Sequence, residues 1–284
     1  MAIFSNRATL SYNGNTTNSN IAYGEILDIL TVTKTAVEGV YAPGELVTYA
    51  VTLRNTGSAA LNSLTVSDNL GGYAFNGTTV YPLTYQNGSA TLFIDGALQA
   101  APAVVAGPPL VVSGINLPAG SDAVLVYQAL ANEFANPNLG GEIDNTVTVT
   151  GGGLTSPVTA SETVTAAEAP ELSICKSITP SQVVDNDRVT YTFVLQNSGN
   201  QALVATDNAV ITDTFDPILT ALAVSFNGVS WTEGVEYNYN EATGLFSTVA
   251  GQITVPAATY TQDPVSGAYS LAPGTATLVV SGTI

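Results

Sequence analysis

The sequence predicts an all-β protein made of two antiparallel β-sandwich domains and one additional N-terminal strand. Short segments in which apolar and polar residues alternate, such as 46–53, occur along the whole chain. A pattern of such segments occurs twice, which indicates two domains of the same kind. The chain has 284 residues, of which 45% are hydrophobic, and this suffices for two separate cores.

The first copy of the pattern follows an opening strand at 1–12 and a polar segment at 13–28, which we interpret as a flexible linker. We place the first sandwich domain at 29–154. Its strands are expected at 30–36, 47–54, 64–70, 117–127 and 142–150, with turn residues between them.

The second copy begins after 155–171, a stretch rich in Pro, Ser, Thr and Ala that we interpret as a second linker, and it occupies 172–284. Its strands are expected at 172–178, 189–196, 210–215 and 271–280. We find no counterpart of 142–150 in this copy. The second sandwich is therefore expected to lack its last strand, which leaves unpaired backbone groups along an edge.

The opening strand is the expected replacement for the missing one. Asn6 aligns with Asn145, and the interval from Asn6 to Lys34 is close to the interval from Asn145 to Lys176. Inserted into a neighbouring molecule, this strand would join molecules head to tail, and a head-to-tail contact that does not close builds a filament. Closure within one molecule stays open, because residues 13–27 would reach about 50 Å if extended.

Charge and composition exclude several classes of function. The net charge is −17 with only five basic residues, so neither nucleic acid nor an anionic membrane surface is expected as a partner. The chain has no histidine and one cysteine, Cys175, which excludes histidine-based catalysis and Cys/His zinc sites. We expect no conventional enzyme, no cofactor and no metal. The sequence shows no run of membrane-spanning length and no Sec signal peptide.

Three polar residue types recur at matching positions of the two copies. Both lysines of the chain lie in the first strand of a copy, where alternation places them on the inward, apolar face. A charged amine there is costly unless it is paired or neutral. The inward-facing residues are Lys34 and Lys176, Asp68 and Asp213, and Asn145 with its counterpart Asn6.

This trio is what a spontaneous Lys–Asn isopeptide bond requires. Burial lowers the pKa of a lysine, so that the neutral amine acts as nucleophile. Burial raises the pKa of an aspartate, so that a protonated carboxyl polarises the asparagine carbonyl and transfers protons. We expect an internal bond between Lys34 and Asn145 with Asp68 as the autocatalytic group. The alternative is a buried Lys–Asp ion pair with the asparagine as a hydrogen-bond partner, and the sequence leaves both open.

In the second domain the expected bond joins two molecules. Lys176 of one molecule would react with Asn6 of the next, and Asp213 would assist as Asp68 does in the first domain. Cys175 is adjacent to Lys176 and therefore faces outward, either as a free thiol or in an intermolecular disulfide.

Several motifs resemble a known family. They are Val-Thr-Lys-Thr-Ala at 32–36, Pro-Gly-Glu-Leu-Val-Thr-Tyr at 43–49, Leu-Arg-Asn-Thr-Gly at 53–57, Leu-Thr-Val-Ser-Asp-Asn-Leu at 64–70 and Asp-Asn-Thr-Val-Thr-Val-Thr at 144–150. The pattern resembles the bacterial surface repeat called "domain of unknown function eleven" over 30–150, and less closely over 172–284. This resemblance implies Ig-like sandwiches in stalks and surface fibres. The two-repeat layout is similar to clostridial spore-appendage subunits, and the Lys/Asp/Asn layout to isopeptide-forming pilin and adhesin domains.

We therefore expect a structural subunit of an extracellular filament on a cell or spore surface, with further copies of itself as its partner and an anchoring protein that the sequence does not identify. The alternative is a monomeric cell-surface adhesin or carbohydrate-binding stalk module, whose loops would bind a ligand.

Overall fold

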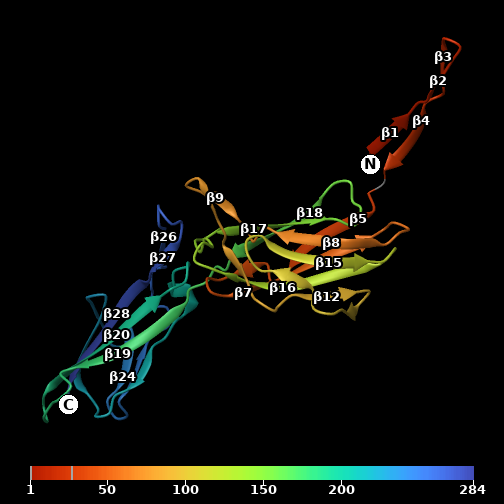
Figure 1. Ribbon diagram of the computed structural model, residues 1–284. Coiled ribbons are helices and arrows are strands. Elements are labelled where there is room, and N and C mark those ends of the chain that lie inside the picture. Colours follow the sequence, from red (N-terminus) through yellow and green to blue (C-terminus); the bar gives the residue numbers. More distant parts are fainter. Residues whose placement is uncertain (1, 27) are drawn as a thin grey trace.

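The structure is a computed structural model that describes residues 2–26 and 28–284. A narrow N-terminal hairpin, a first sandwich domain and a second sandwich domain follow one another in an elongated molecule (Figure 1). Apart from a short 3-10 helix, η1 (Ala205–Asp207), the described elements are β-strands. The predicted all-β fold with two antiparallel, Ig-like sandwich domains is confirmed.

The N-terminal hairpin has two arms. Strand β1 (Ala2–Asn6) pairs with β4 (Ala22–Ile26), and β2 (Thr9–Tyr12) pairs with β3 (Asn15–Asn18), both antiparallel. The strand expected at 1–12 is thus present as two strands within 2–12, but residues 13–26 of the segment 13–28, expected as a flexible linker, supply the returning arm. Residues 1 and 27 lie outside the described residues.

The turn at the tip of the hairpin explains this difference. Asn13 and Gly14 both have positive φ, 42° and 78°, which is the backbone of a two-residue hairpin turn, and Asn-Gly is the sequence that favours it most. The polar composition of 13–28 hid this local signal.

The first domain consists of two sheets packed face to face. One sheet has the order β13 (Ala97–Leu98), β12 (Thr91–Ile94), β16 (Asp122–Ala131), β7 (Leu46–Asn55) and β5 (Leu30–Ala36), and β11 (Leu83–Tyr85) also pairs with β16. The other has the order β14 (Ala103–Val105), β15 (Leu110–Leu117), β8 (Leu61–Asp68), β17 (Glu142–Thr150), β18 (Val158–Ala166) and β6 (Val40–Tyr41). Strands β9 (Tyr73–Phe75) and β10 (Thr78–Val80) form a small separate hairpin.

Strand β18 extends the first domain beyond its expected boundary at 154. It pairs with β17 along its whole length and with β6 in parallel. Alternation of Val158, Ala160, Glu162, Val164 and Ala166 turns these side chains inward, so the stretch is a strand of small residues rather than the linker expected at 155–171. The connection between the domains is confined to 167–171.

The second domain has a smaller core. Its main sheet has the order β19 (Leu172–Thr179), β20 (Arg188–Asn197), β28 (Gly274–Thr283), β22 (Thr220–Phe226) and β23 (Val229–Trp231). The facing sheet consists of β21 (Thr212–Thr214), β25 (Leu245–Thr248) and β24 (Tyr237–Asn240), and β26 (Thr259–Gln262) pairs with β27 (Tyr269–Ala272).

One side of the second domain is open. Strands β19 and β21 correspond to β5 and β8 of the first domain. Whereas β8 lies between β15 and β17, β21 is paired on one side only, with β25, in the described chain. Every residue of β19 is exposed, because no described strand occupies the positions that β17 and β18 fill in the first domain.

The domains meet at the end of the first domain that carries β6. Asn200 Nδ2 donates to the carbonyl oxygens of Pro137 and Ala167, at 3.0 and 2.8 Å, and the Tyr269 N–H donates to the Glu133 carbonyl at 2.8 Å. The N-terminal hairpin projects from the opposite end of the first domain (Figure 1).

Candidate crosslinking sites

The first candidate site lies between the two sheets of the first domain. Lys34 comes from edge strand β5, Asp68 ends β8, and Asn145 lies in β17, which is adjacent to β8. Asp68 is opposite Val147 in the β8–β17 ladder, so Asn145, two residues before Val147, shares its inward face. All three side chains are buried.

The carboxylate of Asp68 is held by three donors. Lys34 Nζ donates to Oδ2 at 2.6 Å, the Tyr127 hydroxyl donates to the same oxygen, and the Leu70 N–H donates to Oδ1 at 2.7 Å. Charge-assisted hydrogen bonds of this kind fix a carboxylate firmly. The orientation of the Asp68 side chain is therefore fixed by hydrogen bonds to both carboxylate oxygens.

The amine of Lys34 is enclosed by aromatic rings. Nζ lies 4.6 Å from the ring centroid of Tyr49 and 5.9 Å from that of Tyr127. Burial lowers the pKa of Lys34 from 10.5 to about 8, against the opposing effects of Asp68 and Glu162, which raise it. This is the direction that the sequence analysis expected, and it brings the neutral amine within reach near physiological pH.

Asn145 is the residue whose polar atoms are unsatisfied. It is 0% exposed, and neither its Oδ1 nor its Nδ2 has a hydrogen-bond partner in the described chain. Its carboxamide lowers the pKa values of Tyr49 and Tyr127, against the larger effect of burial, which raises both. A buried asparagine without partners costs free energy and needs an explanation.

The second candidate site is open to solvent. Lys176 of β19 forms an ion pair with Asp213 of β21. The side chain of Lys176 is 40% exposed and that of Asp213 18%, whereas those of Lys34 and Asp68 are 0% and 2% exposed. The expected inward orientation is present, but the lysine is uncovered because β17 and β18 have no counterpart over it.

Aromatic rings surround the second lysine as they surround the first. Lys176 Nζ lies 4.5 Å from the ring centroid of Tyr191, 5.4 Å from that of Phe215 and 5.5 Å from that of Phe193. Tyr191 corresponds to Tyr49 in the repeat. The adjacent Cys175 is exposed and unbridged.

Asn6 lies away from both sites. It ends β1 in the hairpin, opposite Ala22 of β4, and is exposed. The structure thus brings together Lys34, Asp68 and Asn145, and it pairs Lys176 with Asp213. Within one molecule, β1, which ends at Asn6, lies far from β19, which contains Lys176 (Figure 1).

Sequence reasoning missed Tyr49, Tyr127 and Glu162. Alternation along 46–53 and 122–131 could have placed both tyrosines on the inward face, but their approach to Lys34 depends on the pairing of β7 with β16, in which Tyr49 and Tyr127 are directly opposite. Glu162 was hidden because its strand looked like a linker. It is opposite Asn145 in the β17–β18 ladder.

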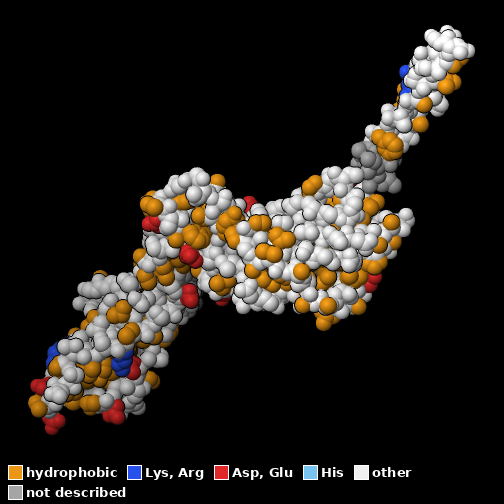
Figure 2. All heavy atoms as spheres, in the orientation of Figure 1, with side chains coloured by type: hydrophobic (Ala, Val, Ile, Leu, Met, Phe, Trp, Pro, Cys, Tyr) orange, Lys and Arg blue, Asp and Glu red, His pale blue; other side chains and the backbone are white. Residues whose placement is uncertain are grey.

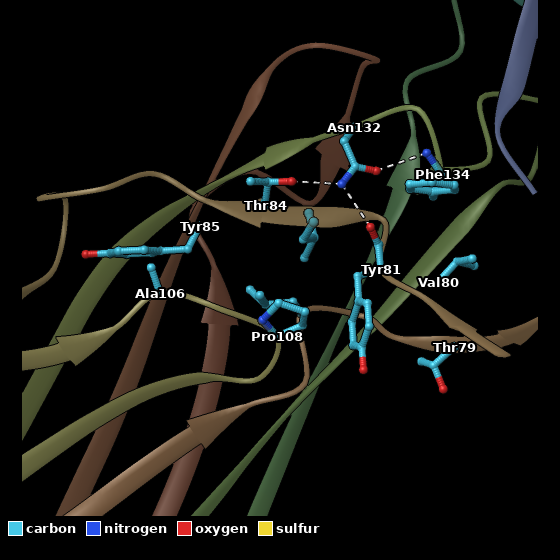
Figure 3. Close-up of a pocket in the computed structure, with 11 residues that line it drawn as sticks. Thr79, Val80, Tyr81, Thr84, Tyr85, Ala106, Pro108, Asn132 and Phe134 are labelled. Carbon is cyan, nitrogen blue, oxygen red and sulfur yellow. Dashed lines mark hydrogen bonds between the residues drawn. The ribbon is translucent and has the colours of Figure 1, made fainter. Parts of the chain in front are cut away.

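The adhesin alternative requires a ligand pocket, and the first domain contains a cavity of about 280 Å³. Its lining includes Tyr81, Thr84, Asn132 and Phe134 (Figure 3). The Asn132 amide donates to the Tyr81 carbonyl and the Thr84 hydroxyl and accepts from the Phe134 N–H. Its polar atoms are therefore engaged in holding the surrounding loops.

Two properties of the described residues bear on other functions. Among residues 2–26 and 28–284, no group of three or more His, Cys, Asp or Glu is arranged to hold a metal ion. In the same part of the chain, no helix is long and apolar enough to cross a membrane.

No protein-family model matches this chain, and no curated protein matches it. Among solved structures, the pilus backbone protein of Streptococcus pneumoniae is 12% identical with a TM-score of 0.34, over 86% of this chain and 55% of its own. The full-length major pilin of Corynebacterium diphtheriae is 10% identical with a TM-score of 0.35, over 85% and 60%. A C-terminal fragment of the major pilin of Streptococcus agalactiae is 11% identical with a TM-score of 0.36, over 87% and 91%.

Proposed function

We propose that the chain is the structural subunit of an extracellular bacterial fibre that assembles head to tail with itself and is reinforced by Lys–Asn isopeptide bonds. The observation that carries this proposal is the buried carboxamide of Asn145, unsatisfied in the described chain and enclosed with the Lys34–Asp68 pair. An unsatisfied buried polar group costs about 1–3 kcal/mol. Conversion into an amide bond with Lys34 removes one of these groups, the Nδ2, from the protein.

The reaction in the first domain balances without an oxidant or a reductant. The neutral Nζ of Lys34 attacks Cγ of Asn145, and the Cγ–Nδ2 bond breaks. Asp68 takes a proton from Nζ and delivers one to the departing nitrogen, so that the products are an amide and one ammonia. Tyr127 holds the carboxyl group in place during both transfers. Enclosure in the core supplies the effective concentration that this step needs.

The second domain contains the same pair without its asparagine. Lys176 and Asp213 are in contact and exposed, and β21 has a free edge in the described chain. A donated strand with Asn6 at the position of Asn145 completes the trio and pairs with that edge. The bond then forms between molecules, and each subunit receives one neighbour and donates to another.

This organisation makes further copies of the chain its partner and places it in an extracellular appendage on a cell or spore surface, as the motif resemblance suggests. Each lysine reacts once, so the chemistry assembles the fibre and turns over no external substrate. The strongly acidic surface keeps separate fibres apart by charge repulsion.

Two inactive variants test this proposal when they are mixed. Lys176→Ala retains the donor Asn6, and Asn6→Ala retains the acceptor Lys176, so each alone should remain monomeric in boiling denaturing gels. Their mixture should give one covalent heterodimer, whose junction peptide contains Lys176 joined to Asn6 with the loss of one ammonia. If the mixture stays monomeric while wild-type chains assemble without a covalent ladder, the intermolecular bond does not form.

A further inference from the structure

We propose that the donated unit is the whole hairpin β1–β4, not a single strand, and that it fills two adjacent strand positions in the second domain of the next molecule. This inference rests on the proposed function and specifies the partner surface of the same site. The occupant is therefore residues 2–26 of a second copy of this chain.

The first domain shows what a complete site contains. Two adjacent strands, β17 and β18, lie between β8 and β6 in one sheet. Strand β17 carries Asn145 to Asp68, and β18 pairs with β17 and packs against β5, the strand of Lys34. Both strands are needed to cover the lysine, and Lys34 is buried as a result.

The open face of the second domain is also two strands wide. One added strand beside β21 would reach Asp213. The inward face of β19 lies further out, and there Leu172 is 47%, Ile174 54% and Ile178 40% exposed, whereas Leu30, the counterpart of Leu172 on β5, is 4% exposed. A second added strand covers these side chains and removes their apolar surface from water.

The register of the hairpin matches the strand pair that it would replace. Asn6 is opposite Ala22 in the hairpin, and Asn145 is opposite Glu162 in the first domain. When Asn6 is placed at the position of Asn145, strand β4 therefore falls at the position of β18. The end of the hairpin opposite to its Asn13-Gly14 turn then lies next to residues 182–183 of the acceptor, which are the counterpart of β6.

The hairpin fills the same two positions of the core with a different distribution of side-chain volume. The core of the first domain contains Ile143 opposite Val164, both buried. The hairpin has Phe4 opposite Gly24 at these positions, and a Cβ added at Gly24 would clash with the Phe4 ring. A large residue next to a missing side chain replaces two of intermediate size, which is the kind of exchange that cores tolerate.

The free hairpin has a surface suited to burial. A two-stranded hairpin is only marginally stable in water, and this one exposes apolar side chains along both arms (Figure 2). These exposed side chains are Ile3, Phe4, Leu10, Tyr12, Ile21 and Tyr23. Those on the Asn6 face enter the core of the acceptor in the proposed complex.

Chain length directs the hairpin to another molecule. Strand β4 ends at Ile26 and β5 begins at Leu30, so the three intervening residues span at most about 10 Å. Leu30 is at the end of the first domain opposite to β6 and the second domain, and β5 alone is about 23 Å long. Asn6 is opposite Ala22, four residues before Ile26, so in the intact hairpin it lies within about 27 Å of Leu30. Asn6 therefore reaches about the far end of the first domain, but not Lys176, which lies in β19 of the second domain of its own chain.

A double-mutant cycle distinguishes hairpin from single-strand donation. The donor is Lys176→Ala with additional changes in the hairpin, the acceptor is Asn6→Ala, and the initial rate of heterodimer formation is measured. Gly24→Val should slow the reaction about tenfold, because the added side chain overpacks the space that the Phe4 ring fills. Phe4→Ile together with Gly24→Val recreates the Ile143–Val164 pair and should restore the rate to within about threefold of the parent donor.

Single-strand donation predicts the opposite sign. In that case β4 must separate from β1 before the reaction. Gly24→Val weakens the hairpin and would therefore leave the rate of heterodimer formation unchanged or increase it. That result would contradict hairpin donation without contradicting the proposed fibre. Gly39→Val is the matched control, because Gly39 is a surface glycine with open space around it. If the parent variants form neither a covalent nor a non-covalent heterodimer, both the hairpin and the proposed function are overturned.

Discussion

The Nζ of Lys34 lies 2.6 Å from Oδ2 of Asp68 with both side chains excluded from solvent. The corresponding pair in the second domain, Lys176 and Asp213, is equally in contact but open to solvent. The two halves of the chain thus contain the same reactive pair in a closed and an open form. The difference between them is the strand pair that covers the first.

Lys34→Ala should prevent the internal bond of the first domain. The intact mass of a wild-type monomer is expected to be lower than its sequence mass by one ammonia, and that of the variant to equal its sequence mass. Loss of a crosslink that closes a loop of roughly 100 residues should lower the free energy of unfolding by about 4–5 kcal/mol, as for a disulfide of that span. The mass of Asn145→Ala should likewise equal its own sequence mass, and its free energy of unfolding should fall by a similar amount. A wild-type monomer at its full sequence mass contradicts the internal bond.

Asp68→Asn should stop bond formation while retaining the shape of the side chain. It removes the proton carrier and leaves a buried lysine without its charge partner, which costs about 3–5 kcal/mol. Asp122→Asn is the matched control, because Asp122 pairs with Arg54 at 3.2 Å on an exposed surface and should cost less than about 1 kcal/mol. Mass spectrometry and urea unfolding measure both effects. A complete ammonia loss in Asp68→Asn would show that the carboxylate has no part in the step.

The pH dependence follows from the lowered pKa of Lys34. Bond formation in freshly refolded chains should accelerate about tenfold per pH unit below pH 8 and level off above it, because the neutral amine is the nucleophile and burial lowers the pKa of Lys34 to about 8. A rate that is independent of pH between about 6 and 8 would contradict this.

The same shift should appear in stability once the bond is prevented. In Asn145→Ala, the unfolded chain binds a proton at Lys34 that the folded chain has released between pH 8 and the ordinary value of 10.5. The free energy of unfolding should therefore rise with pH across this window, by up to about 3 kcal/mol. The buried Tyr49 and Tyr127, whose pKa values are raised, oppose this rise above their ordinary value near 10. Adding Lys34→Met should abolish the slope between about pH 8 and 9.5.

Tyr127→Phe should slow the internal bond and leave the intermolecular one unchanged. The Tyr127 hydroxyl donates to Asp68, and loss of a hydrogen bond to a charged group is worth about 1.5–3 kcal/mol, a decrease in rate of roughly ten- to a hundredfold. In the second domain, Val280 stands opposite Tyr191, as Tyr127 stands opposite Tyr49, so the Lys176 site has no such donor to lose.

The readout for Tyr127→Phe separates positioning from folding. The rate of ammonia loss is followed in refolded chains while the heterodimer rate serves as the internal control. Equal slowing of both bonds, or a variant that fails to fold, would contradict a local role of the hydroxyl. Tyr49→Phe, which removes a hydroxyl without a hydrogen-bond partner in the described chain, should have a smaller effect.

Much of the architecture follows from the sequence, because alternation is a local property of a strand. It determined the two sandwich domains and the inward faces of Lys34 and Asp68, and the repeat predicted an uncovered edge in the second domain. Pairing between distant strands is not local. Only the tertiary structure decided that Tyr127 meets Asp68 and that β18 belongs to the first domain, whereas the returning arm of the N-terminal hairpin has a local signal in Asn13-Gly14. The exposure of the two lysines was also decided by the tertiary structure. Lys34 and Lys176 lie on the same face of their repeats, but only Lys34 is buried, because β17 and β18 cover it.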